Sequence, residues 1–203
     1  MDNFDLNELQ HDSLIELLNI SVGTSASVLS EMAHSEIRLS VPQLYQIPRR
    51  QVIELIEEST TGNVVSINME THGFVSGESM LIFSEESSLS LVEVILQGQV
   101  PLELLTEMAE EALIEVGNVV LGTCLSTLAD LLDKKLTTSV PFSVHGSVAE
   151  VIGSGETEIL FLRVNFSHEY GKDSGFITLM FDVASVDNIS AAIDAYLKKL
   201  NIM

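Results

Sequence analysis

Apolar residues recur at helical spacing in two long segments of the chain. In residues 7–33 they stand mostly three or four positions apart, at Leu14, Leu17, Leu18, Val22, Leu29 and Met32. Residues 103–132 repeat this pattern. Because positions three and four apart lie on one face of an α-helix, the spacing predicts two long amphipathic helices, the first bent or tightened near Gly23.

Segments with a period of two follow each of these helices. Residues 37–41 and 136–140 alternate and are each followed by a proline, so they predict strands that end there or lie at a sheet edge. The later patterns predict helices at 49–58, 87–96 and 186–200, and strands at 64–70, 76–83, 158–167 and 176–182. Each strand pair is joined through glycine, at Gly73 and at 171–175, as a hairpin. This order favours an α+β fold over a doubly wound one.

The two halves of the chain share residues when one is slid by 99 positions without a gap. The first-half matches are Leu14, Ile15, Glu16, Asn19, Gly23, Thr24, Ser27, Leu29, Ser40, Val41 and Pro42, which reappear at positions 113–141. A common ancestral unit explains this, so we expect an internally duplicated fold with pseudo-twofold symmetry, its β-sheet covered by the two long helices. Without a flexible linker between them, repeats of about 7–98 and 103–200 should form a single domain spanning 1–203.

Composition narrows the possible partners and the cellular location. The formal charge of −21, from 30 acidic against 9 basic residues, opposes nucleic acid and anionic membrane surfaces. We find no apolar stretch of the roughly 18 residues that a spanning helix needs and no secretory start, so we expect a cytoplasmic protein without membrane insertion. Cys124 is the only cysteine, and we interpret it as a small core residue.

Polar residues shared by both halves are the candidates for function. The apolar matches serve packing in any repeated fold, whereas Glu16 with Asn19, and Glu115 with Asn118, put a carboxylate and an amide on one helix face. An amide can hold a water and a carboxylate can pair with a partner's lysine, which suits a protein that completes the hydrolytic site of another. For one isolated pair, a solvated helix face would be the better interpretation, but retention in both copies favours function.

Other chemistry has little support in the sequence. The five histidines lack metal-ligand spacing, and no phosphate-binding glycine loop or nucleophile elbow occurs.

The shared residues follow a longer pattern. Asp12-x3-Glu16-x2-Asn19-x22-Pro42 recurs as Glu111-x3-Glu115-x2-Asn118-x22-Pro141. With two copies in a chain of this length, the sequence resembles the CheC branch of the CheC/CheX/FliY phosphatases of chemotaxis, which belong to two-component signalling. CheX proteins keep one such motif and FliY proteins carry a further domain.

The resemblance implies dephosphorylation of the phospho-aspartyl response regulator CheY. It assigns water placement to Asn19 and Asn118 and docking onto a lysine of the regulator to Glu16 and Glu115, with Asp12, Pro42, Glu111 and Pro141 as supporting motif positions. Magnesium belongs to the regulator, so the chain needs no cofactor or metal of its own.

Within this resemblance, the two sites are not identical. Leu18 stands where the second copy has Gly117, and a bulkier residue there is expected to crowd the docking face beside Asn19. We therefore expect both sites to work, with the site at Asn118 less crowded than the site at Asn19.

Alternatives from other classes stay open. The chain could be a non-catalytic adaptor that binds CheD, as relatives do, or a duplicated ligand-sensing fold that binds a small molecule at the seam between the halves. Two sites in one chain favour a monomer.

Overall fold

The computed structural model describes residues 6–97, 102–168 and 175–202. The helices are α1 (Glu8–Ala33), α2 (Arg49–Glu57), α3 (Glu85–Ile95), α4 (Leu102–Leu131), α5 (Val148–Ile152) and α6 (Val186–Lys199), with a short 3₁₀ turn at Val183–Ser185. The strands are β1 (Ile37–Leu39), β2 (Gln43–Pro48), β3 (Val64–Gly73), β4 (Gly77–Ser84), β5 (Leu136–Thr138), β6 (Phe142–Gly146), β7 (Glu158–His168) and β8 (Gly175–Asp182).

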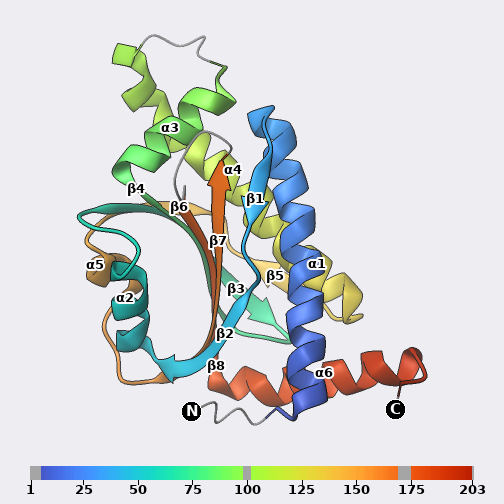
Figure 1. Cartoon of the computed structure of the whole chain (residues 1–203). Helices are drawn as coiled ribbons and strands as arrows, with labels where there is room; N and C mark the ends of the chain where they lie inside the picture. The colour runs from blue at the N-terminus through green and yellow to red at the C-terminus, as the bar shows by residue number, and fades with distance from the viewer. Residues whose placement is uncertain (1–5, 98–101, 169–174, 203) are drawn as a thin grey trace.

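All described strands join one antiparallel sheet in the order β1-β7-β8-β4-β3-β5, with β2 also paired to β7 and β6 also paired to β3. Helices α1 and α4 cover one face, and α2 and α5 lie on the other (Figure 1). The predicted α+β class, with a sheet covered by two long helices, is confirmed. Central strands such as β8 are buried on both faces, which explains their continuous apolar runs.

The strand pairing is unchanged when the two halves are exchanged. β1 and β2 pair with β7 as β5 and β6 pair with β3, and β4 pairs with β8 at the centre. In these strands the halves align at an offset of 98, with Gly77 matching Gly175, and Met80 lies opposite Thr178, its own counterpart at that offset. On the helices, Ser25 hydrogen-bonds its counterpart Cys124. These two self-contacts mark a pseudo-twofold axis; the common origin of the halves and the single-domain organisation stay predictions from the sequence.

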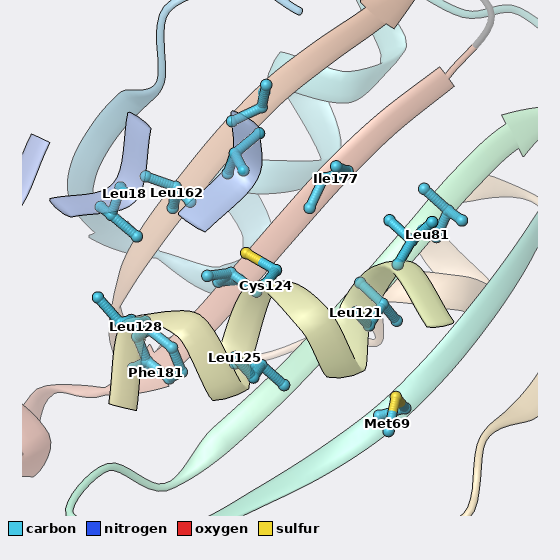
Figure 2. Packing of buried hydrophobic residues seen from close by; sticks show 14 of the residues in the cluster. Leu18, Met69, Leu81, Leu121, Cys124, Leu125, Leu128, Leu162, Ile177 and Phe181 are labelled. Carbon is cyan, nitrogen blue, oxygen red and sulfur yellow. The ribbon is translucent and has the colours of Figure 1, made fainter. Parts of the chain in front are cut away.

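The two long helices are fixed by burial and by caps. Asn7 and Gln10 form a capping box at the start of α1, and the Gln10 side chain continues to Ser190 Oγ and Asp194 Oδ1 of α6, each at 2.8 Å. The apolar faces of α1 and α4 meet the sheet in the larger core cluster, where Cys124 sits among leucines (Figure 2). Its expected role as core filler is confirmed.

Helices α1 and α4 are also long and apolar enough to cross a membrane, judged by length and composition alone. The sequence expectation that no such stretch exists was therefore wrong. About half of each apolar window, 44% and 50%, is buried within the structure, as a core helix of a folded domain requires.

Most of the predicted helices and strands are present in the structure, but the sequence analysis missed two edge strands and one short helix. The sequence patterns missed β2 and β6, which resume each edge strand after its proline, and the single-turn helix α5. Both prolines do stand at the interruption of an edge strand, as expected. The predicted connection at 171–175 falls mostly outside the described residues.

Candidate functional site

On α1, the candidate residues form one exposed stripe. Asp12, Glu16 and Asn19 lie within an arc of about 60° because each step of three or four residues nearly completes a turn. Asp12 and Glu16 are exposed and Asn19 is half-buried. The Asp12 carboxylate lies 3.5 Å from His11 Nδ1. The stripe faces solvent because the positions between, such as Leu17, carry the buried side of the helix.

The same stripe recurs on α4. Glu111, Glu115 and Asn118 are all exposed. Within the described part of the chain, neither Glu–Asn pair forms a hydrogen bond or an ion pair with any other side chain. Each carboxylate and amide therefore remains available to an external partner, and a solvated carboxylate can accept a hydrogen bond or pair with a cation.

Each motif proline ends a short Ser-Val-Pro segment that is built identically in both halves. Ser40 donates its backbone N–H to Asn165 O at 2.9 Å, and its Oγ accepts from the N–H of Asn165 at 3.0 Å. Ser139 makes the same two bonds to Glu70, at 2.9 and 3.0 Å. The serine thus completes the strand pairing with its side chain, while the following residue turns outward.

These segments push a valine into solvent beside each motif helix. Val41 is 69% exposed and Val140 is 83% exposed, whereas Pro42 is buried and Pro141 half-buried. The expectation that the shared apolar residues serve packing is therefore wrong for these valines. The repeat match had already singled them out, but nothing in the periodic pattern separated them from core positions.

Val41 and Pro42 lie at the same height along α1 as Asn19. Strand β1 runs back along α1 (Figure 1) and begins where the Ile37 N–H donates to Ser30 Oγ at 3.0 Å. From that point Asn19 lies about 17 Å back along the helix and Pro42 about 17 Å along the strand. Glu16, Asn19 and Val41 therefore belong to one surface, and the symmetric pairing gives Glu115, Asn118 and Val140 the same relation.

The two stripes are separate sites. Helices α1 and α4 run antiparallel (Figure 1) and cross at the contact between Ser25 and Cys124. Asn19 and Asn118 each precede that contact by six residues, so they lie on opposite sides of it, roughly 18 Å apart along the helices. One phosphoryl group cannot meet both asparagines, and each pair must act alone.

Beside the asparagines, Leu18 and Gly117 are accommodated on the buried side of their helices. Leu18 is 2% exposed and lines a small core cavity with Leu162 (Figure 2), so the expected crowding of the docking face was wrong. Gly117 lies against Ile67, and a Cβ at this position would overlap the Ile67 Cγ2 methyl. Neither residue therefore contributes to the outward surface of its helix.

Other reactive groups do not contribute to these sites. Burial raises the pKa of the Cys124 thiol to about 12, against a smaller opposing effect of the hydrogen bond with Ser25, so the thiol stays protonated and unreactive. Among the described residues, no three His, Cys, Asp or Glu side chains come together as a metal site.

Comparison with known proteins assigns the chain to a family, although no family model matches it. The chain is 30% identical over 159 residues to the CheY-P phosphatase CheC of Bacillus subtilis, covering 76% of this chain and 75% of that protein. It belongs to the CheC family of chemotaxis proteins. It is also 24% identical over 197 residues to the flagellar motor switch phosphatase FliY of B. subtilis, and spans only 51% of that longer relative.

Solved structures share the fold of this CheC-family chain. The crystal structure of Thermotoga maritima FliY has a TM-score of 0.75 at 18% identity, covering 95% of this chain and 100% of that one. The CheX of a CheX–CheY–BeF3–Mg complex from Borrelia burgdorferi has a TM-score of 0.62 at 22% identity, covering 83% and 99%. At these identities the likeness concerns the fold alone.

Proposed function

We propose that the chain is a phosphatase that hydrolyses the aspartyl phosphate of a CheY-like response regulator. The observation that carries the proposal is the pair of stripes, each with a glutamate and an asparagine that have no partner among the described residues. A stripe of this kind can complete an active site only when another protein supplies the reacting group. The names of the CheC and FliY relatives supply the class of that group.

In the proposed reaction Asn19 or Asn118 orients a water in line with the phosphorus atom. The amide oxygen accepts a hydrogen bond from the water while the amide N–H₂ donates to the partner. As the new P–O bond forms, the bond to the aspartyl oxygen breaks, which leaves the aspartate carboxylate and inorganic phosphate. Catalysis of this kind is positioning joined to the electrostatics of the receiver, whose Mg²⁺ neutralises the transferred group.

Glu16 and Glu115 are assigned to docking. A carboxylate one turn before the asparagine is placed to pair with a cationic side chain at the rim of the receiver's site, which fixes the register of the amide against the phosphoryl group. Asp12 and Glu111 extend the same stripe by one further turn. We expect these glutamates to contribute mainly to affinity, and the asparagines mainly to the rate of hydrolysis.

Phosphate release tests the proposal. Receiver phosphorylated with acetyl phosphate is mixed with catalytic amounts of the wild-type chain, of Asn19→Ala/Asn118→Ala and of Asn188→Ala, a control at an exposed asparagine on α6. Acceleration by wild type and control, but not by the double variant, is the expected result. Equal rates with all three proteins would refute the assignment.

A second candidate is an adaptor without catalysis. The fold is shared, at 12% identity and TM-score 0.63, with FliM in a FliG–FliM complex from Helicobacter pylori. A chain of this fold can thus serve assembly, and CheD is the partner that the CheC resemblance suggests. If no CheY receiver loses phosphate faster in the presence of the chain, while the chain still binds CheD, the adaptor is the correct function.

A further inference from the structure

A groove runs beside the second site, between α4 and β5. Its volume is about 390 Å³. The helix wall consists of Gly122, Leu125, Ser126, Ala129 and Asp130, and strand residues as far as Thr138 form the other wall. Gly122 lies one helical turn after Asn118, so the groove opens directly onto the exposed stripe.

The groove carries positive charge in a strongly acidic protein. Lys134 and Lys135 line it together with one carboxylate, Asp130, although the chain has only 9 basic residues against 30 acidic ones. Both lysines are exposed, and neither forms a salt bridge of 4.0 Å or less with a carboxylate in the described part of the chain. The charge of Lys134 also acts on Asp133, but that carboxylate is already hydrogen-bonded to Lys199, so the surface keeps an excess of positive charge that can attract an anionic partner.

The first half does not repeat this feature. The residues equivalent to Lys134 and Lys135 are Ser35 and Glu36, and the Glu36 carboxylate is exposed and paired with Arg38 at 3.3 Å. The surroundings of Asn19 and Asn118 therefore differ in charge although the stripes themselves match. An anionic partner is favoured at the second site and not at the first.

We propose that the α4–β5 groove is a docking surface for the acidic face of the phosphorylated receiver, which makes the Asn118 site the principal one. This rests on the proposed phosphatase function. A receiver that holds Mg²⁺ on carboxylates and carries a phosphoryl group is anionic around its reacting atom. The lysines attract that face and align it along α4, and Asn118 then meets the phosphoryl group.

The test separates the sites by mutation. Lys134→Gln/Lys135→Gln is combined with Asn19→Ala, which leaves only the second site, and with Asn118→Ala, which leaves only the first. The control pair Arg38→Gln/Lys198→Gln changes net charge equally outside the groove. The probe is Mg²⁺-loaded B. subtilis CheY, with acetyl phosphate for turnover and with beryllofluoride for binding.

In the Asn19→Ala background, the lysine substitutions should raise KM about five- to tenfold at low salt with kcat unchanged, because exposed charges contribute modestly and additively to encounter. At 0.5 M salt the difference should fall below about twofold. In the Asn118→Ala background they should change nothing.

Three outcomes would overturn the inference. An unchanged KM in the Asn19→Ala background, or an equal rise with the control pair, refutes groove docking while Asn-dependent phosphate release still supports the phosphatase. If Asn19→Ala/Asn118→Ala releases phosphate as fast as wild type, the phosphatase proposal fails. The binding measurement then decides the groove proposal on its own: if Lys134→Gln/Lys135→Gln binds beryllofluoride-loaded CheY as tightly as wild type, the groove proposal fails as well.

Discussion

Replacing Gly117 by alanine should push α4 away from the sheet at the second site. Gly117 directly precedes Asn118 and faces the sheet. A Cβ added there would overlap the Cγ2 methyl of Ile67 on β3. Two other glycines of the motif helices, Gly23 and Gly122, have open space where a Cβ would go. They are matched controls for the same chemical change.

The sign of the effect follows from two opposing contributions. Alanine at an open helical position stabilises by about 0.4–1 kcal/mol, because glycine leaves more conformational freedom in the unfolded chain. Overpacking a filled core costs about 1–3 kcal/mol. Gly23→Ala and Gly122→Ala should therefore raise the free energy of unfolding, while Gly117→Ala should lie below these controls by about 1–3 kcal/mol.

Urea unfolding followed by circular dichroism measures these differences. The variant Ile67→Ala alone should lose about 2–5 kcal/mol through the cavity it leaves. Combined with Gly117→Ala it should lose less than the sum of the single changes, since the removed methyl is the one that collides. The reasoning is wrong if Gly117→Ala is as stable as Gly122→Ala, or if the double variant is strictly additive.

Three further predictions concern the surface and the core. Val41→Asp/Val140→Asp should raise KM for the phosphorylated receiver at least about fivefold. Because both valines are exposed, the free energy of unfolding in urea should change by less than about 0.5 kcal/mol. Unchanged kinetics would show that the valines are not part of the docking surface. Cys124 should resist a thiol-specific disulfide reagent at pH 8 until the protein unfolds, and rapid reaction of the native protein would contradict its burial. The hydrogen bond and the charge of Lys199 lower the pKa of the Asp133 carboxyl. The stability that this interaction contributes is therefore present above the ordinary pKa of 3.8 and is lost as the pH falls through the lower pKa of the folded protein. In Lys199→Gln, NMR titration should find the Asp133 pKa raised, and an unaltered pKa would refute the coupling.

The sequence predicted the elements whose signals are local and strong. The helical spacing located α1 and α4, whereas the contact between the equivalent residues Ser25 and Cys124 became visible only in the structure. Strands β2 and β6 escaped prediction because each is an edge strand with one mixed face, where polar residues such as Gln43 are tolerated. Period-two patterns weaken wherever burial is partial.

Only some residues of the candidate sites could be predicted from the sequence. Retention of Glu16 and Asn19 as Glu115 and Asn118 identified polar positions on the outer face of the helices, because packing does not explain them. The exposure of Val41 could not be read from the sequence, since it depends on Ser40 completing the strand pairing with its side chain. The lysine groove was likewise invisible, because it requires α4 and β5 to lie side by side.

The most direct test of the central claim is the rate constant for loss of phosphate from phosphorylated CheY at saturating concentrations of the chain, measured for wild type and for Asn19→Ala/Asn118→Ala. If the asparagines position the attacking water, wild type should exceed the spontaneous rate at least about a hundredfold and the double variant should return close to it, with receiver binding retained. A double variant that keeps the wild-type rate at saturation would contradict the account.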